Sequence, residues 1–324
     1  MKQDTATLDS LKKSHYLQNF LDDIAPLIPY LEDPKVTDIR TSQDGEIIVK
    51  VFGQGKVFTG KALSKSKIRG IVLSAAAMLE KNIDPVNGTP KLEAVIPPPY
   101  SARITGLLPP WVDYPMVWLR LPPKTIYPLE DYVEKKRLTQ AQYGLICEYV
   151  KNRKNILVGG ATGSGKTTFA NAVLKKMAEY TPNENFYVVE DVPELQLAAR
   201  DKTMLAVKPK EAAEAVRTAL RCDPDRIIFG EVRYGEVANE LLKSWNTGHT
   251  GNITTIHADS PSSMISRFED LLREEIKGSI PNVAATIHLC VHLSATPNGP
   301  VVDGVLPSSC PENGAMFENA GHAP

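Results

Sequence analysis

Short apolar runs alternate with helix-like segments throughout the second half of the chain. The runs "NILVGG", "FYVVED", "RIIFGE" and "GNITTIH" predict strands at 155–160, 186–191, 226–231 and 251–257. The segments around them carry apolar residues at helical spacing, which predicts helices at about 138–152, 166–180, 210–220, 235–245 and 262–276. Apolar strands that alternate with helices are typical of a parallel sheet covered on both faces. This half is therefore predicted to be an α/β domain.

The first half, to about residue 125, has a different pattern. Strand-like runs separated by turns, such as "EIIVKVFG" at 46–53, precede one clearly helical stretch at 64–82. Proline is then dense over 95–123, and because proline fixes φ and removes a backbone donor, it favours short strands with extended connections. The pattern predicts a smaller α/β domain at 1–120, a linker at 121–130 and the larger domain at 131–295. The tail, 296–324, is predicted to hold at most one short strand and then disorder.

Composition narrows the class of protein. The 324 residues suffice for about two domains, and shares of 42% hydrophobic and 23% charged residues are ordinary for a globular protein. A net charge of −1 gives no basic excess for nucleic acid or an anionic membrane. The polar N-terminus does not resemble a signal peptide, and the apolar runs are shorter than the ~20 residues of a membrane span. We expect a soluble cytoplasmic protein that reaches a membrane through a partner.

The four cysteines argue against zinc or redox chemistry. Cys147, Cys222, Cys290 and Cys310 are scattered, with no C-x-x-C pair. The run "HLCVH" places His288, Cys290 and His292 on one face of a possible strand. Residues two apart on a strand converge poorly on one metal ion, and no fourth ligand is apparent. We interpret this run as a core strand.

The strongest motif is G-x-x-x-x-G-K-[ST], which lies between the strand at 155–160 and the helix at 166–180. A chance match is expected in only about one chain in a hundred of this length at average glycine content. Glycines let the loop wrap a phosphate, and the helix N-terminus adds partial positive charge. Lys166 is expected to reach the β- and γ-phosphates of ATP, and Thr167 to bind Mg²⁺. The predicted loop comprises Gly160, Ala161, Thr162, Gly163, Ser164, Gly165, Lys166, Thr167 and Thr168.

Acidic residues follow two predicted strands. Ligands of an open parallel sheet lie at the carboxyl ends of its strands, where Glu231 could orient or deprotonate water. Glu190, Asp191 and Glu194 end the preceding strand and suit a Mg²⁺ shell through water. We favour Glu190 among them, although some of these acids could simply cap the following turn.

Two histidines stand in the run "NTGHTGNITTIHADSP" at 246–261. A zinc site is disfavoured because His249 and His257 are spaced too widely, and no nucleophile turn lies nearby for a hydrolase triad. His257 ends a strand beside the predicted phosphate loop, where it could donate to the γ-phosphate. A histidine hydrogen-bonded within the core remains the alternative.

Four segments, taken together, resemble a known family. "GATGSGKTT", "VVEDVPEL", "LRCDPDRIIFGEVR" and "TGHTGNITTIHADSP" stand in the order of the four boxes of the type II/type IV secretion ATPase superfamily, and they are most similar to the TrbB-type conjugal transfer ATPases. "LEDPKVTDIRTSQDGEIIVKVFG", "PPPYSARITGLLPP" and "MVWLRLPP" resemble that family's N-terminal domain. The resemblance covers roughly residues 20–295.

The resemblance implies a RecA-like ATPase domain after a PAS-like N-terminal domain. It also implies a ring-shaped homo-hexamer that hydrolyses ATP with Mg²⁺ and works with inner-membrane components of a type IV secretion or conjugation apparatus. Lys166 and Thr167 match Walker A, Glu190 the acidic box, Glu231 Walker B, and His249 with His257 the histidine box. Arg103 and Arg120 match the N-terminal-domain arginines, and Arg221 and Arg233 flank Walker B. One such arginine can raise the rate by ~10³–10⁵, although each could instead form a surface ion pair.

Three other functions remain as alternatives. A ring-shaped nucleic-acid translocase shares the P-loop but needs a positive track for phosphates, which this near-neutral chain does not show. A small-molecule kinase usually opens with its P-loop, whereas about 150 residues precede it here, and no arginine-rich lid stands out. A nucleotide-bound scaffold without hydrolysis does not require Glu231.

Overall fold

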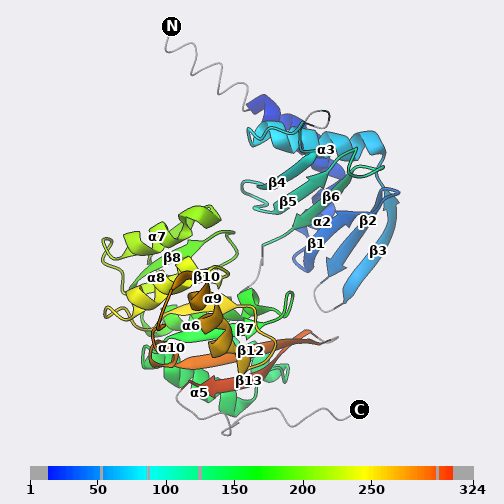
Figure 1. Cartoon of the computed structure of the whole chain (residues 1–324). Coiled ribbons are helices and arrows are strands. Elements are labelled where there is room, and N and C mark those ends of the chain that lie inside the picture. The colour runs from blue at the N-terminus through cyan, green and yellow to red at the C-terminus, as the bar shows by residue number, and fades with distance from the viewer. Residues whose placement is uncertain are drawn as a thin grey trace. The chain divides into compact units, whose positions relative to one another are not determined.

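The computed structural model describes residues 14–51, 54–84, 86, 88–122, 126–296 and 299–308. The chain forms two compact units, Met1–Thr125 and Ile126–Pro324 (Figure 1). Among the described residues, no helix is long and apolar enough to cross a membrane. The predicted tail falls outside them from residue 309 onward.

The first unit is an antiparallel sheet packed against helices. Its six strands lie in the order β3-β2-β1-β6-β5-β4. The elements are η1 (Ala25–Leu27), α2 (Ile28–Glu32), β1 (Val36–Thr41), β2 (Glu46–Val51), β3 (Gly55–Ala62), α3 (Lys65–Met78), β4 (Lys91–Val95), β5 (Arg103–Leu107) and β6 (Met116–Arg120). Two of these strands, β5 and β6, therefore form within the proline-rich segment, and β4 ends at its first residue.

The long helix of this unit, α3, is stabilised by a capping residue and by one apolar face. The Ser64 side chain caps its first turn by accepting from the Lys67 amide at 3.2 Å. One face, including Ile68, Ile71 and Val72, is fully buried in the unit's core. The helix approaches the sheet so closely that a Cβ on Gly106 of β5 would lie 2.6 Å from the Val72 side chain. Burial of this face is expected to supply most of the helix's stability.

The second unit is the predicted parallel sheet. Its seven strands lie in the order β13-β12-β7-β11-β10-β8-β9, and every neighbouring pair is parallel except β12 with β13. The strands are β7 (Ile156–Gly160), β8 (Asn185–Glu190), β9 (Asp201–Ala206), β10 (Arg226–Val232), β11 (Ile253–Ile256), β12 (Leu289–Thr296) and β13 (Gly299–Pro307). The nine-residue β13 is longer than the short strand expected after residue 295.

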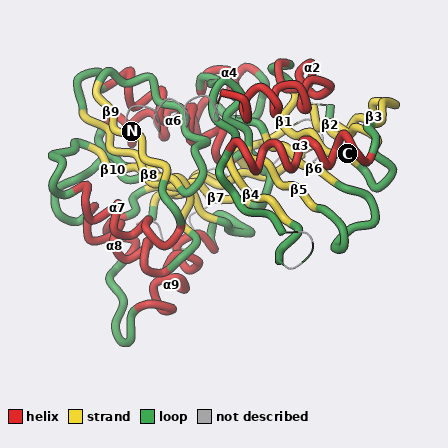
Figure 2. Tube along the Cα trace, turned by 90° about the horizontal axis from the view of Figure 1, so that it is seen from above, coloured by secondary structure: helices red, strands yellow, loops and turns green. Residues whose placement is uncertain are grey.

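Helices cover both faces of this sheet, as Figure 2 shows for α6 on one side and α7, α8 and α9 on the other. The helices are α4 (Leu129–Glu134), α5 (Gln140–Lys151), α6 (Lys166–Tyr180), α7 (Ala212–Ala219), α8 (Gly235–Trp245), α9 (Ser263–Glu275) and α10 (Val283–Thr286), with the short η2 (Pro209–Glu211) before α7. The helix α4 begins within the segment predicted to be linker.

Two separate cores result from the alternation of side chains along each strand. In β7, Ile156 and Val158 face a core shared with α4, α5 and α6. Leu157, between them, faces the core formed with α7, α8 and α9. All three side chains are fully buried, which explains why β7 reads as an unbroken apolar run rather than an alternating one.

Candidate nucleotide site

The loop after β7 has the backbone that a phosphate cradle requires. β7 ends at Gly160 and α6 begins at Lys166. Gly160, Gly163 and Gly165 have φ angles of +144°, +76° and +88°, a region that side chains other than glycine rarely adopt. A Cβ on Gly160 would also lie 2.3 Å from the Leu293 carbonyl oxygen. The glycines of the predicted motif are therefore needed for the path of the backbone.

Lys166 lies folded back over this loop. Its ammonium donates to the carbonyl oxygens of Gly160 at 2.9 Å and Ala161 at 3.1 Å, and the residue is only 6% exposed. Two residues from other strand ends approach the same nitrogen, namely His257 Nδ1 at 3.3 Å and Glu231 Oε1 at 3.7 Å. The fold thus brings together the lysine, carboxylate and histidine that the sequence predicted separately.

Glu231, near the end of β10, is surrounded by positive and donor groups. Its Oε1 lies 3.2 Å from His257 Nε2, and its Oε2 accepts from Arg233 Nε at 2.6 Å. Burial pushes the pKa of this carboxyl upward, but the charges of Arg233, His257 and Lys166 and the Arg233 hydrogen bond hold the pKa below its ordinary value. Glu231 is therefore ionised at neutral pH.

His257 follows the last residue of β11 and bridges the lysine and the carboxylate. Burial and the nearby Lys166 charge lower its pKa, so the neutral imidazole prevails at neutral pH. An ammonium only donates and a carboxylate only accepts. The contacts therefore assign the proton to Nε2, which donates to Glu231, while Nδ1 accepts from Lys166. The ring orientation is fixed on both sides.

The acidic residues at the end of β8 and in the loop that follows have three different environments. Glu190 is 3% exposed, and its Oε1 accepts from the amides of Glu194 at 3.0 Å and Leu195 at 2.9 Å. Glu194 Oε2 accepts from the Thr167 hydroxyl at 3.2 Å. Asp191 forms an ion pair with Arg233. Thus Glu194, rather than the favoured Glu190, directly contacts the hydroxyl predicted to bind Mg²⁺.

The burial of Glu190 leads to a prediction about stability and pH. Burial raises the pKa of Glu190 to about 7. The two amide hydrogen bonds lower this pKa, and the negative charges of Glu194 and Asp191 raise it further. A carboxyl with a raised folded-state pKa stabilises the fold fully below the unfolded value near 4.5 and loses that contribution as the pH rises through 7. Glu190→Gln keeps the acceptor oxygen without the charge. We expect its free energy of unfolding, relative to the wild type, to rise between pH 5 and 8.

Urea unfolding of the nucleotide-free proteins measures this difference, which amounts to about 1.4 kcal/mol for each unit of pKa shift. The variant Glu211→Gln, at an exposed position of η2, is the control and should follow the wild type. If the difference in free energy of unfolding between Glu190→Gln and the wild type is constant from pH 5 to 8, the raised pKa of Glu190 is contradicted.

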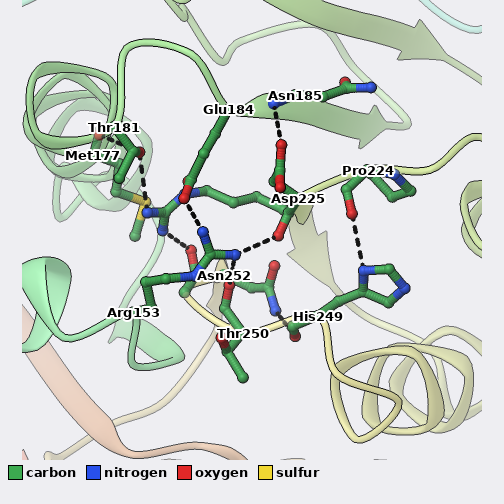
Figure 3. A network of polar contacts seen from close by, with 12 residues as sticks. Arg153, Met177, Thr181, Glu184, Asn185, Pro224, Asp225, His249, Thr250 and Asn252 are labelled. Carbon is green, nitrogen blue, oxygen red and sulfur yellow. Dashed lines mark hydrogen bonds and ion pairs between the residues drawn. The ribbon is translucent and has the colours of Figure 1, made fainter.

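The structure does not bring His249 to the nucleotide site. His249 precedes β11 while His257 follows it, so the strand holds the two residues at opposite edges of the sheet. The Nδ1 atom of His249 lies 2.9 Å from the Pro224 carbonyl oxygen, and its own carbonyl accepts from Asn252 Nδ2 at 2.6 Å (Figure 3). His249 is therefore hydrogen-bonded within the protein and is not directed at a phosphate.

His249 borders a polar network at the amino ends of the parallel strands (Figure 3). The fully buried Arg226, at the start of β10, forms an ion pair with Glu184 and donates to the Gly251 carbonyl. Arg153 also pairs with Glu184 and donates to the Asp225 carbonyl at 2.9 Å. These contacts satisfy backbone carbonyls at the edge of the sheet opposite the phosphate loop.

The predicted arginines lie in three places. Arg103 and Arg120 occupy directly opposed positions on β5 and β6 of the first unit. Arg233 lies in the nucleotide site between Glu231 and Asp191. Arg221 lines a surface hollow of about 380 Å³ together with Glu214, Arg217 and Thr218. Since Arg221 precedes β10, it lies toward the amino edge of the sheet, away from its own chain's phosphate loop.

The "HLCVH" run forms strand rather than a metal site. Cys290 and His292 are buried in β12, and β12 lies within the sheet because β13 flanks it. His292 contacts Asp303 and the Ala258 carbonyl, and His288 accepts from the Asn155 amide at 3.1 Å. Within the described part of the chain, no group of three or more His, Cys, Asp or Glu side chains could hold a metal ion.

A glycine-rich loop between a parallel strand and a helix, with an acid at a neighbouring strand end, defines a P-loop NTPase. Residues 62–310 match the family model described as "Type II/IV secretion system protein". The chain belongs to this family and is an ATPase.

Individual relatives and solved structures agree with this family assignment. The chain is 36% identical to the conjugal transfer protein TrbB of Rhizobium radiobacter over 245 residues, 75% of this chain and 74% of that protein. It is 28% identical to the type IV secretion system protein VirB11 of Bartonella henselae, covering 82% and 87%. The ATPase DotB of Legionella pneumophila matches with a TM-score of 0.65 at 20% identity, covering 88% and 80%. The predicted fold class, a RecA-like domain after a smaller α/β domain, is confirmed.

Proposed function

We propose that this chain is the ATP-hydrolysing subunit of a hexameric motor that powers channel or pilus assembly and substrate transfer in a type IV secretion or conjugation system. One observation carries the proposal, namely the convergence of Lys166, Glu231 and His257 at the end of the phosphate loop. The relatives named for conjugal transfer and type IV secretion supply the biological setting. The motor is expected in the cytoplasm, attached to inner-membrane components through partners.

In this proposal each residue at the sheet edge has one task. The amides of Gly160–Thr168 and the Lys166 ammonium bind the phosphates. Glu231, held ionised, orients the attacking water. His257 contacts the γ-phosphate, and this contact is lost when the phosphate leaves. Arg233, which joins Glu231 to Asp191, stabilises the charge of the transition state.

The oxygen donors near Thr167 fit a Mg²⁺ ion. Thr167 and Glu194 offer a hydroxyl and a carboxylate within 3.2 Å of each other, and Glu190, the last residue of β8, accepts from the Glu194 amide. Magnesium prefers oxygen ligands and retains several waters, so the acids would bind through water. The ion would neutralise phosphate charge.

The paired arginines of the first unit support a shared site. Arg103 and Arg120 are Cα partners on adjacent strands, so their like charges lie on one face of the sheet, which they share with Asp38, the Cα partner of Arg120 on β1. We propose that they help to complete a nucleotide site. Functionally, we divide the chain into the N-terminal domain at 1–120, a linker at 121–130, the ATPase domain at 131–295 and a tail.

The Mg-ATPase rate per subunit, measured as protein concentration is raised, tests this function. A ring motor whose sites are completed by neighbours should show a rate that climbs to a plateau as sizing shows assembly. A constant rate down to dilutions at which the protein is monomeric means self-contained sites and refutes the hexameric motor. Transfer of the phosphoryl group to a small molecule would instead identify a kinase.

A further inference from the structure

The β12–β13 hairpin reaches the phosphate loop on the side away from the hydrolytic residues. A Cβ on Gly165, the residue before α6, would lie 2.9 Å from Pro300 Cβ and 3.0 Å from Pro300 Cγ. The proline ring at the start of β13 therefore packs directly against the loop. Gly165 has a φ of +88°, so both its conformation and this contact require glycine.

Arg137 adds a planar cation to the same hairpin. A Cβ on Gly299 would lie 2.7 to 3.0 Å from the Arg137 guanidinium atoms, which therefore lie against the backbone beside Pro300. The Arg137 carbonyl also accepts from the Val302 amide at 2.8 Å. A main-chain bond and a side-chain contact thus hold Arg137 next to the proline.

The order of the strands determines which end of the nucleotide meets this surface. The residues for hydrolysis come from β11, β10 and β8, on one side of β7, while β12 and β13 lie on the other. Lys166, His257 and Glu231 therefore mark the γ-phosphate end. Strands are spaced by about 4.8 Å, so a nucleoside triphosphate, which is longer than one spacing, would reach β12 and β13 if its nucleoside end points away from these residues.

We propose that Arg137 and Pro300 form the nucleoside subsite of the ATPase, where the purine base stacks against the guanidinium and the proline ring. This inference rests on the proposed ATPase site and adds the residues that hold its non-phosphate end. A guanidinium stacks on aromatic faces and supplies several donors in a fixed plane. The apolar proline ring provides the second contact that a base requires.

The experiment compares the affinities of the full chain for ATP and for inorganic tripolyphosphate by calorimetry. Arg137→Ala is expected to weaken ATP binding about tenfold, the loss of one stacking contact with a cation, while tripolyphosphate binding stays unchanged. The new Cβ of Gly299→Ala would displace the Arg137 guanidinium. This variant should therefore also lose ATP affinity about tenfold relative to its tripolyphosphate affinity. Lys136→Ala, at the exposed neighbouring cation, is the matched control and should change neither affinity.

Two outcomes overturn the subsite and differ from failure of the ATPase site itself. Equal losses of ATP and tripolyphosphate affinity in Arg137→Ala mean a structural or phosphate role. Wild-type ATP affinity in that variant means that the base binds elsewhere. A wild-type protein that binds neither ligand refutes the proposed ATPase site, and the nucleoside subsite with it.

Discussion

Replacement of Lys166 by alanine is expected to lower ATP turnover by at least about 10²–10³-fold, since one preorganised donor at the reacting group is worth that much. The ammonium is buried and already faces Glu231 at 3.7 Å and His257 at 3.3 Å. Phosphate oxygens would replace the carbonyls of Gly160 and Ala161 as its acceptors. No other lysine described in the structure contacts this loop by a hydrogen bond or ion pair.

Phosphate release under saturating Mg-ATP measures this effect. Lys175→Ala, on the same helix but outside the loop, should turn over at the wild-type rate. Circular dichroism and thermal unfolding distinguish a lost donor from a lost fold. Turnover in Lys166→Ala within tenfold of the wild type contradicts the role of the P-loop lysine.

Replacement of Glu231 by glutamine is expected to separate binding from hydrolysis. The amide keeps the shape and an acceptor oxygen for Arg233 and His257, but it removes the charge that orients and activates water. General base catalysis contributes about 10²–10⁴-fold, so kcat should fall by that range. ATP affinity should stay the same or rise, because a carboxylate beside the γ-phosphate repels it.

Equilibrium titration with ATP and single-turnover hydrolysis measure the two properties of Glu231→Gln separately. Glu236→Gln, an acid on α8 that is 55% exposed and pairs loosely with Arg217, serves as the control. Equal hydrolysis by Glu231→Gln and the wild type contradicts the role of this carboxylate in activating water.

The nucleotide loop could be predicted in detail because its conformation is determined by residues that are adjacent in the sequence. Spacing from Gly160 to Thr167, with a strand before and a helix after, determines the path of the backbone. Glu231 and His257 were predictable because parallel strands end at one edge of the sheet. His249 precedes the strand predicted at 251–257, so that prediction already separated it from His257, and only the family resemblance grouped the two.

Features that depend on distant partners were missed. The strand β9 is an exposed edge strand with little apolar content, so its sequence shows neither alternation nor an apolar run. The contact between Thr167 and Glu194 requires the loop after β8 to turn back, which the Glu190 carboxylate achieves by binding two amides. No sequence pattern distinguishes Arg137 from other surface arginines, since its proposed role depends on β13, more than 160 residues further along the chain.

We infer that the contact between Lys166 and Glu231 links nucleotide binding to activation of the carboxylate. While the ammonium and imidazole face the carboxylate, its oxygens are engaged and poorly placed to activate water. A bound triphosphate would compete for the ammonium and so withdraw it from Oε1 of Glu231, while Arg233 still holds Oε2. Binding of ATP would therefore both occupy the site and make Glu231 available to activate water.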